Sequence, residues 1–424
     1  MKTMVCLCLL AGAAWASAQN PTPNEVYGKP FFVKNTWVIG GEGNWDNLAV
    51  DAGAQRLYIA HGPVVQVVDL ETGALAGRVE GLQDARSVTL DDSGDTGFVS
   101  DVKAGKIVFF DRRTQQIKSS IPIPSAPRAL VFDAQDKLLF AISYQPPPPV
   151  PLRTESLKDP NGQPIRMSDG KIVTYKVPDR SLIPKSAARP ETFITVIRTE
   201  TQAIVGHIAF SGQLSSAVID RSGQLFLGVS DRNYLLHLDV PAIASRFQRG
   251  GSAPAVTIDW RDVETGDAAH NNWDAPGHPD IYSLLPACDH AANLAIDSRQ
   301  QRLFIACENR KLVVLNALRG EALTFIQLNT VPDALAYDPD RSLLYAANGS
   351  GTLTIFLQHV TDSFAFIQDL PTLAQARTLA VNPVSGNVYL VTNRTGFTIS
   401  KPGGPGTLTT APVQGSFQIL VVGN

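Results

Sequence analysis

The segment LAVDAGAQRLYIAHGPVVQVVDLETG (residues 48–73) contains three short apolar runs separated by tight turns. The first run ends in Asp51, the second in His61 and the third in Asp69. Short apolar runs bounded by Gly, Pro and Asp are typical of buried β-strands joined as an antiparallel meander. A fourth run, Leu75 to Val79, follows Gly73, so this stretch predicts a unit of four strands.

The same arrangement occurs seven times along the chain, and each copy is marked by the Asp or Asn that closes its first apolar run. These end-markers are Asp51, Asp91, Asp133, Asp220, Asp297, Asp338 and Asn382, and the steps between them are 40, 42, 87, 77, 41 and 44 residues. The two long steps each hold one copy and an insertion. A four-stranded unit of about 40 to 45 residues is the signature of a β-propeller blade. We therefore predict an all-β, seven-bladed β-propeller in a single domain.

The last copy lacks one strand, because only Phe417 to Val422 follows its second run. An extra strand, Phe31 to Ile39, precedes the first copy. We expect this N-terminal strand to complete the C-terminal blade, which closes the ring and removes an exposed sheet edge.

Two insertions interrupt the repeat, at about 145–190 and 261–290. The first interrupts blade three between its second and third strands, and we expect the second to connect blade four to blade five. Both kinds of link open on the same rim of a propeller. Long loops on a rigid scaffold often carry function, so we expect both insertions to rise over one mouth of the central channel.

The N-terminus has the organisation of a secretory signal peptide. Lys2 is followed by the apolar run Met4 to Ala14 and by the small residues Ala16-Ser17-Ala18. We expect residues 1–18 to be removed and the mature domain (19–424) to begin at Gln19 in the periplasm or outside the cell. The formal net charge is −3 without runs of like charge, so a nucleic-acid partner is not expected. No later run is long enough to span a membrane, and we expect a monomer.

The second strands of several copies resemble those of the bacterial YVTN-type, or YncE-like, seven-bladed propellers. The resemblance rests on Leu57-Tyr58-Ile59-Ala60, on Leu344 to Gly349 and on Val388 to Asn393, and it covers nearly all of the mature chain. The strict tetrapeptide that names the family is absent. The resemblance implies the fold more than an activity, because such propellers serve as binding modules, scaffolds, lactonases and quinone or haem enzymes.

The residue five positions before each end-marker opens an inner strand and is expected to line the channel mouth. These openers are Asp46, Arg86, Arg128, Ser215, Ala292, Asp333 and Arg377. Three guanidiniums and two carboxylates around one axis form either a funnel for a carboxylate or phosphate, or a plug in which Arg and Asp pair with one another. The sequence leaves both interpretations open.

A second polar ring is expected at the ends of the second strands, on the same rim. Its members are His61, Asp101, Tyr144, Asp231, Glu308, Asn348 and Asn393. Asp and Asn are common in turns for local backbone reasons, so most of these residues need no ligand to explain them. We nevertheless keep His61 and Asp101 with the openers as candidate ligand-binding residues.

Metal and thiol chemistry have fewer candidates. His270, His278 and His290 are interleaved with Asp residues in the second insertion, but their spacing is not that of a local metal motif, so a metal site is not favoured. Cys288 and Cys307 are the two cysteines left after removal of the leader. In an exported protein they are expected to form a disulfide.

These features favour a binding or scaffold module that holds a small anionic molecule, a peptide or a cell-envelope protein at the Arg-lined mouth. No cofactor is predicted, since the sequence contains no phosphate-loop, nucleophile-elbow, haem-attachment or zinc-protease motif. The alternative is an enzyme on the same face, either a metal-assisted lactonase-like hydrolase or a quinone- or haem-type oxidoreductase.

Overall fold

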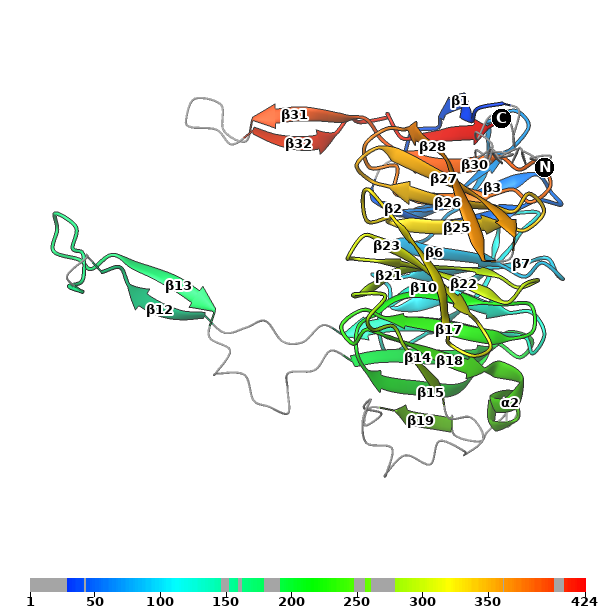
Figure 1. Cartoon of the computed structure of the whole chain (residues 1–424), viewed down its shortest axis with the longest axis horizontal. Coiled ribbons are helices and arrows are strands. Elements are labelled where there is room, and N and C mark those ends of the chain that lie inside the picture. Colours follow the sequence, from blue (N-terminus) through cyan, green and yellow to red (C-terminus); the bar gives the residue numbers. More distant parts are fainter. Residues whose placement is uncertain are drawn as a thin grey trace, which may run out of the picture.

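The computed structural model describes residues 29–41, 43–145, 152–158, 162–178, 191–247, 256–260, 279–360, 362–399 and 408–424. Within these residues, seven antiparallel blades are arranged around one axis, and Figure 1 views the ring from its side. The predicted all-β, seven-bladed propeller is therefore confirmed. The signal segment 1–18 and the expected start at Gln19 lie outside the described residues.

Four blades are uninterrupted meanders whose strands follow chain order from the channel outwards. Blade one consists of β2 (Trp45–Asp51), β3 (Arg56–His61), β4 (Val64–Asp69) and β5 (Leu75–Val79). Blade two consists of β6 (Ala85–Leu90), β7 (Thr96–Asp101), β8 (Lys106–Asp111) and β9 (Ile117–Pro122). Blade five consists of β21 (Ala291–Asp297), β22 (Arg302–Cys307), β23 (Lys311–Asn316) and β24 (Ala322–Gln327). Blade six consists of β25 (Ala334–Asp338), β26 (Leu343–Asn348), β27 (Thr352–Val360) and β28 (Ser363–Pro371).

Blades three and four carry the insertions. Blade three consists of β10 (Pro127–Asp133), β11 (Leu138–Gln145), β14 (Glu191–Arg198) and β15 (Ala203–Ser211). Its insertion contains a separate hairpin of β12 (Leu152–Ser156) and β13 (Thr174–Pro178). Blade four consists of β16 (Leu214–Ile219), β17 (Gln224–Val229), β18 (Tyr234–Asp239) and β20 (Asp280–Ser283). Two short helices, α2 (Val240–Ala244) and η2 (Ser245–Phe247), follow β18.

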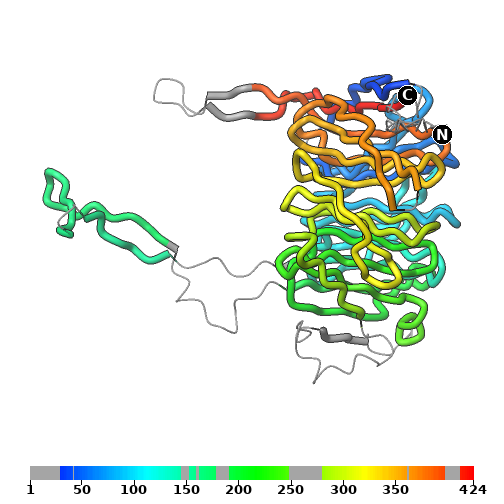
Figure 2. The backbone as a smooth tube through the Cα atoms, viewed as in Figure 1, coloured from blue at the N-terminus to red at the C-terminus, as the bar shows by residue number. Residues whose placement is uncertain are grey.

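Blade seven joins the two ends of the chain. It contains β29 (Thr378–Val381), β30 (Val388–Thr392), β33 (Gln418–Gly423) and β1 (Phe32–Val38), in that order from the channel. A hairpin of β31 (Thr395–Ile399) and β32 (Leu408–Pro412) lies between β30 and β33 in sequence. Strand β1 pairs antiparallel with β33, and Figure 2 shows the blue and red ends of the described chain side by side. The N-terminal strand therefore closes the ring, as predicted.

The repeated Asp has a local physical cause. In all seven blades the end-marker carboxylate or amide oxygen accepts a hydrogen bond from a backbone N–H of the turn that follows. Representative distances are 3.0 Å from Ala54 N to Asp51 Oδ1, 2.9 Å from Ser222 N to Asp220 Oδ1 and 2.9 Å from Val384 N to Asn382 Oδ1. The other four markers make the same bond. The marker therefore fixes the turn between the first and second strands of each blade.

The first strands of successive blades contact one another in a closed ring, from β2 through β6, β10, β16, β21, β25 and β29 back to β2. The hydrophobic core lies between blades. Tyr58, Tyr345 and Tyr389, which occupy equivalent places in second strands, are fully buried in it. The second-strand segments that resemble those of the YVTN-type propellers are thus core segments. Their composition reflects packing between blades.

The prediction that the second insertion connects blade four to blade five is wrong. The fourth strand of blade four is β20, so the long link runs within this blade, from Val240 to Pro279. The more strand-like segment of this link, β19 (Val256–Trp260), instead pairs in parallel with β15 of blade three. β20 takes the outer position because Tyr282 is buried there and stacks on His237, while Asp280 Oδ2 lies 2.9 Å from His237 Nδ1.

This correction changes which rim the insertion leaves. Antiparallel strands alternate in direction, so successive links of a blade alternate between the two rims. We call the rim at which the inner strands begin the mouth rim. The β12–β13 and β31–β32 hairpins both connect second strands to third strands and leave the mouth rim, and Figure 1 shows them on the same side of the ring. The link of blade four starts on the opposite rim, where α2 lies.

Candidate functional site: the channel mouth

The openers occupy a recurrent irregularity at the start of the inner strands. In four blades the pairing between first and second strands skips one residue there. The skipped residues are Arg86, Arg128, Ser215 and Ala292. In blade one the skipped residues are Asp46 and Asn47. Such a β-bulge leaves its extra residue unpaired and redirects the side chain, which is why these positions are available to line the mouth.

The structure brings Asp46 together with all three predicted arginines. Burial raises the pKa of the Asp46 carboxyl above its ordinary value, while the guanidiniums of Arg86, Arg377 and Arg128 act in the lowering direction. These four residues come from blades one, two, seven and three. The opener of blade six, Asp333, accepts a 2.7 Å hydrogen bond from the Gly349 amide. Its carboxylate is therefore engaged with the backbone of its own blade.

The three arginines differ in their partners. Arg86 Nε lies 3.1 Å from Asp84 Oδ2, so Arg86 is paired within its own loop. Arg128 and Arg377 are exposed and form no ion pair with any of the residues that the structure describes. The plug interpretation thus fits Arg86, whereas Arg128 and Arg377 retain free donor groups at the mouth.

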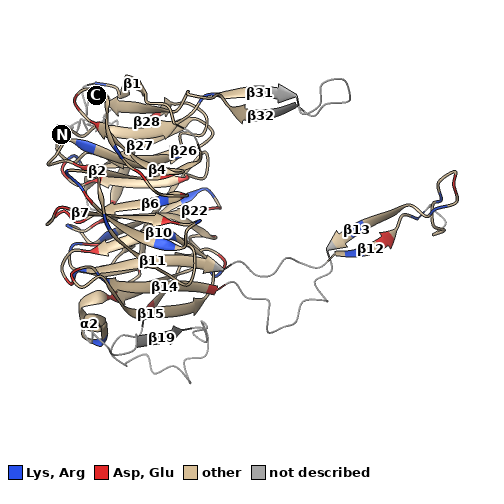
Figure 3. Cartoon of the chain, turned by 180° about the vertical axis from the view of Figure 1, so that it is seen from behind, with Lys and Arg blue, Asp and Glu red and all other residues tan. Residues whose placement is uncertain are grey.

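A cavity of about 640 Å³ opens beside Arg128, between the inner strands of blades three and four. Asp46, Arg128 and Ser215 are the predicted openers that line it, and Tyr144, Gln213 and Asn293 add further polar groups. Its size lies within the range typical of small-molecule sites. Figure 3 shows basic positions on β6 and β10 among strands and loops that carry residues of both charges. The local positive charge at the mouth therefore comes from individual side chains.

His61 is placed away from the open mouth. Its side chain is buried against Phe417, with ring centroids 4.0 Å apart, and its Nδ1 lies 2.7 Å from Gln66 Oε1. Gln66 Nε2 in turn donates to the Gly40 carbonyl oxygen at 3.0 Å. Burial lowers the pKa of the His61 imidazole. His61 thus holds the segment after β1 against blade one, and it offers no free group to a ligand.

Asp101 is also buried and has a structural role. Its two carboxylate oxygens accept hydrogen bonds of 3.0 Å from the backbone amides of Gln83 and Asp84. Asp231 does the same for the Gln213 amide in blade four, at 2.6 Å. In blades two and four, Asp101 and Asp231 therefore clamp the loop that enters the inner strand. In blade two this clamp places the loop that carries Asp84 and Arg86.

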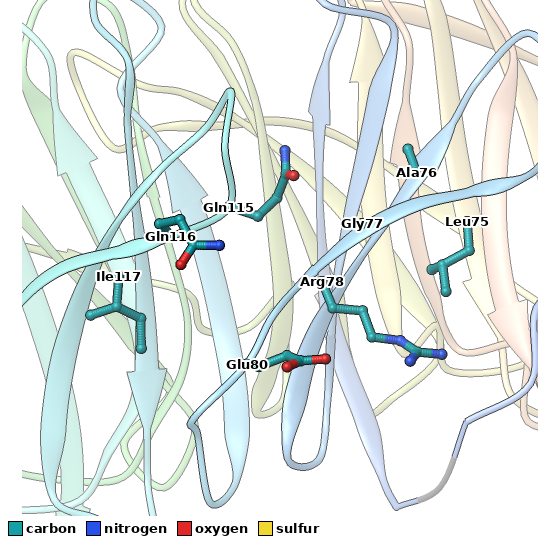
Figure 4. Close-up of a pocket in the computed structure, with 8 residues that line it drawn as sticks. All are labelled: Leu75, Ala76, Gly77, Arg78, Glu80, Gln115, Gln116 and Ile117. Atoms are coloured by element: carbon teal, nitrogen blue, oxygen red, sulfur yellow. The ribbon is translucent and has the colours of Figure 1, made fainter.

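Two other hollows lie elsewhere on the ring. One, of about 520 Å³, is a groove between the outer edges of blades one and two, and Figure 4 shows Leu75 to Arg78 and Glu80 facing Gln115, Gln116 and Ile117 across it. The other, of about 670 Å³, lies on the opposite rim beside Arg112. Arg112 is paired there with Asp51 at 2.5 Å. Both hollows lie away from the channel, and neither is lined by any of the predicted openers.

The remaining predicted residues are the cysteine pair and the histidines that were considered as metal ligands. Cys288 and Cys307 form a disulfide, as predicted, with a Cα–Cα distance of 5.4 Å, and both are buried on the mouth rim. His290 is partly exposed, and its Nδ1 lies 2.9 Å from Asp289 Oδ1. His270 and His278 lie outside the described residues. Among those that are described, no group of three or more His, Cys, Asp or Glu side chains is arranged to hold a metal ion.

Residues next to the openers were missed by the sequence prediction. Asn47 Oδ1 accepts a 2.7 Å hydrogen bond from the Val88 amide, and Ser87 Oγ accepts one of 3.1 Å from the Leu130 amide. Each bond joins one inner strand to the next around the channel. Asn293 is likewise bonded to the Asp333 carbonyl oxygen of the following blade. These residues could have been identified in the sequence, because each is a polar residue that directly follows an opener.

Similar solved structures share the fold and little of the sequence. A chain in "Crystal Structure of Mitotic Checkpoint Complex" aligns with a TM-score of 0.57 at 13% identity, over 92% of this chain and 96% of that chain. The protein in "Structure of U3-55K" aligns with a TM-score of 0.57 at 8% identity, over 83% of this chain and 89% of that chain. No family model and no curated protein sequence matches the chain. At this level of identity the likeness shows a seven-bladed β-propeller and nothing about activity.

No helix among the described residues has the length and apolar character needed to cross a bilayer. The fold and the mouth together are consistent with a propeller of the binding or scaffold class.

Proposed function

We propose that this propeller is an exported binding module that holds a small anionic molecule at the mouth of its channel. The observation that carries the proposal is the pair Arg128 and Arg377, which lack ion-pair partners among the described residues and act together on Asp46. Guanidiniums recognise carboxylates and phosphates through paired N–H donors. The cavity beside Arg128 supports a ligand of small-molecule size.

Export is part of this proposal. The leader-like residues 1–18 motivate it, and the Cys288–Cys307 disulfide is in keeping with an oxidising compartment. The YVTN-type resemblance motivates a bacterial envelope setting. A peptide or an envelope protein that presents a carboxylate would use the same two arginines.

Binding is tested by thermal unfolding of the mature protein with a panel of anions, including phosphate, sulfate, citrate and acetate. We expect at least one anion to raise the melting temperature of the wild type, since a ligand that binds only the folded state stabilises it. The double substitution Arg128→Ala/Arg377→Ala should abolish that shift. Its matched control is Arg113→Ala/Arg299→Ala, which removes the same charge from exposed side chains on the opposite rim.

An unchanged shift in the Arg128→Ala/Arg377→Ala variant would show that the mouth is not the anion site. The enzymatic alternative has its own test. Native mass spectrometry with metal analysis of the purified protein should show the mass of the polypeptide alone or with a small anion. A stoichiometric metal ion, quinone or haem would instead favour the hydrolase or the oxidoreductase.

A further inference from the structure

The cavity at the mouth continues into an apolar cleft at the seam between blades three and four. Its walls there are Ala129, Val131 and Ile142 on one side and Leu214 and Ala217 on the other. All five belong to one hydrophobic cluster or pack against it. Val131 and Ile142 are buried, whereas Ala129, Leu214 and Ala217 remain partly accessible from the channel.

One residue distinguishes this seam from the two seams before it. The residue after the opener is Asn47 in blade one and Ser87 in blade two, and each bonds to a backbone amide of the next inner strand. In blade three the equivalent residue is Ala129, whose methyl group has no acceptor for the amide of the next blade. The side chain after the opener therefore makes no such bond from β10 to β16, and Ala129 instead forms part of the cavity wall.

The two ends of the cavity differ in chemistry. Arg128, Asp46, Tyr144 and Gln213 lie at the mouth, and the apolar wall lies deeper along β10. Val131 is three residues beyond Arg128 in this strand, which corresponds to about 10 Å of extended chain. A ligand that contacts both ends must have an anionic group and, within about that distance, an apolar group.

We infer that the ligand of this propeller is an anionic amphiphile, with its carboxylate or phosphate at Arg128 and its short acyl chain or aromatic ring in the cleft between blades three and four. This inference rests on the proposed function, because it assigns the second half of the same ligand. Burial of the apolar group supplies affinity in proportion to the area removed from water. The arginine fixes the orientation of the ligand, and the cleft selects among anions.

The test is calorimetric titration of the mature protein with straight-chain carboxylates from acetate to octanoate. We expect the dissociation constant to fall by about fourfold for each added methylene until the cleft is full. Ala129→Leu should fill the cleft and remove this dependence on chain length while retaining the affinity for acetate. Retained acetate binding also shows that this variant is folded.

Ala334→Leu is the matched control, because Ala334 has the same place after the opener of blade six and does not line the cavity. It should keep the full dependence on chain length. Equal affinities for all carboxylates in the wild type, or an unchanged length dependence in Ala129→Leu, would overturn the amphiphile inference and leave the anion site standing. Failure of every carboxylate and of phosphate to bind would instead overturn the proposed function itself, and the amphiphile inference with it.

Discussion

Asp46 places a carboxylate inside the group of guanidiniums that is proposed to hold an anion. Burial raises the pKa of this carboxyl, so its negative charge is only partly offset by its surroundings. Asp46→Asn keeps the shape and removes the charge. We expect phosphate to bind the variant about two- to fivefold more tightly, because removing this charge removes a charge–charge repulsion that water at the mouth still screens. Calorimetric titration at low salt measures the change.

Asp92→Asn is the control for this substitution. Asp92 lies on the opposite rim, and burial raises the pKa of its carboxyl as well. It should leave phosphate binding unchanged. Weaker binding in Asp46→Asn would mean that Asp46 orients the arginines, and that its charge is required at the mouth.

His61 gives the fold a dependence on pH. Burial lowers the pKa of its imidazole below the ordinary value of 6.5. Between these two pKa values the unfolded chain binds a proton that the folded chain does not, so stability falls as the pH decreases below about 6.5. We expect His61→Gln to flatten this decline, measured as denaturation midpoints between about pH 5 and pH 8. Part of the decline should persist, since burial lowers the pKa of His207 too.

Equal slopes for the wild type and His61→Gln would show that His61 is protonated in the folded state as readily as in the unfolded chain.

At the scale of elements, β1 closes the ring and covers the edge of β33. Phe31, just before β1, is buried against Tyr345, with ring centroids 6.2 Å apart, and Trp37 stacks on Tyr389 at 6.1 Å. A chain that begins at Gly40 loses both rings and exposes the backbone edge of a buried strand. We expect it to self-associate or to unfold, because open edges pair with other chains. Size-exclusion chromatography with light scattering detects either outcome.

A chain that begins at Lys29 retains β1 and should behave as the longer protein does. Monomeric, fully folded protein from the Gly40 start would show that blade seven is stable with three strands, and that the ring does not depend on β1 for its closure.

Features of the structure that depend on interactions between residues close in sequence could be predicted from the sequence. Asp51 and its counterparts bond to the turn that follows them, so the repeat is visible as spacing, and the fold follows from it. The openers were also predictable, because they stand at a fixed distance before that turn. The partner of Arg86 was not, since Asp84 and Asp46 are both near it in the fold and the sequence does not show which carboxylate it contacts.

The sequence-based predictions were wrong for segments whose placement depends on contacts between residues far apart in the chain. β20 has four residues and weak strand character, and it joins blade four because Tyr282 and Asp280 meet His237 there. β19 has a better strand sequence, yet it pairs in parallel with β15. His61 was assigned to the mouth by its place at the end of β3, but its ring turns into the core against Phe417.

At the scale of the whole molecule, the two faces of the ring carry different features. The arginines, the cavity and the two hairpin arms belong to the mouth rim, whereas the link of blade four starts on the other. The ring itself is held together by cores between blades and by the closure through β1. A face can therefore be altered by changing its arms while the ring is left intact.

The insertion of blade three can be removed without altering the strand pairing around it. Gln145 and Glu191 face each other across β11 and β14, so an Asn-Gly turn can replace residues 146–190 and continue the same register. We expect the shortened protein to unfold cooperatively and to bind phosphate as the wild type does, because the described residues of this insertion, 152–158 and 162–178, do not line the cavity. Thermal unfolding and calorimetric titration test both expectations. A folded variant that no longer binds phosphate would place part of the ligand site in the arm, and the mouth would then act together with its hairpin.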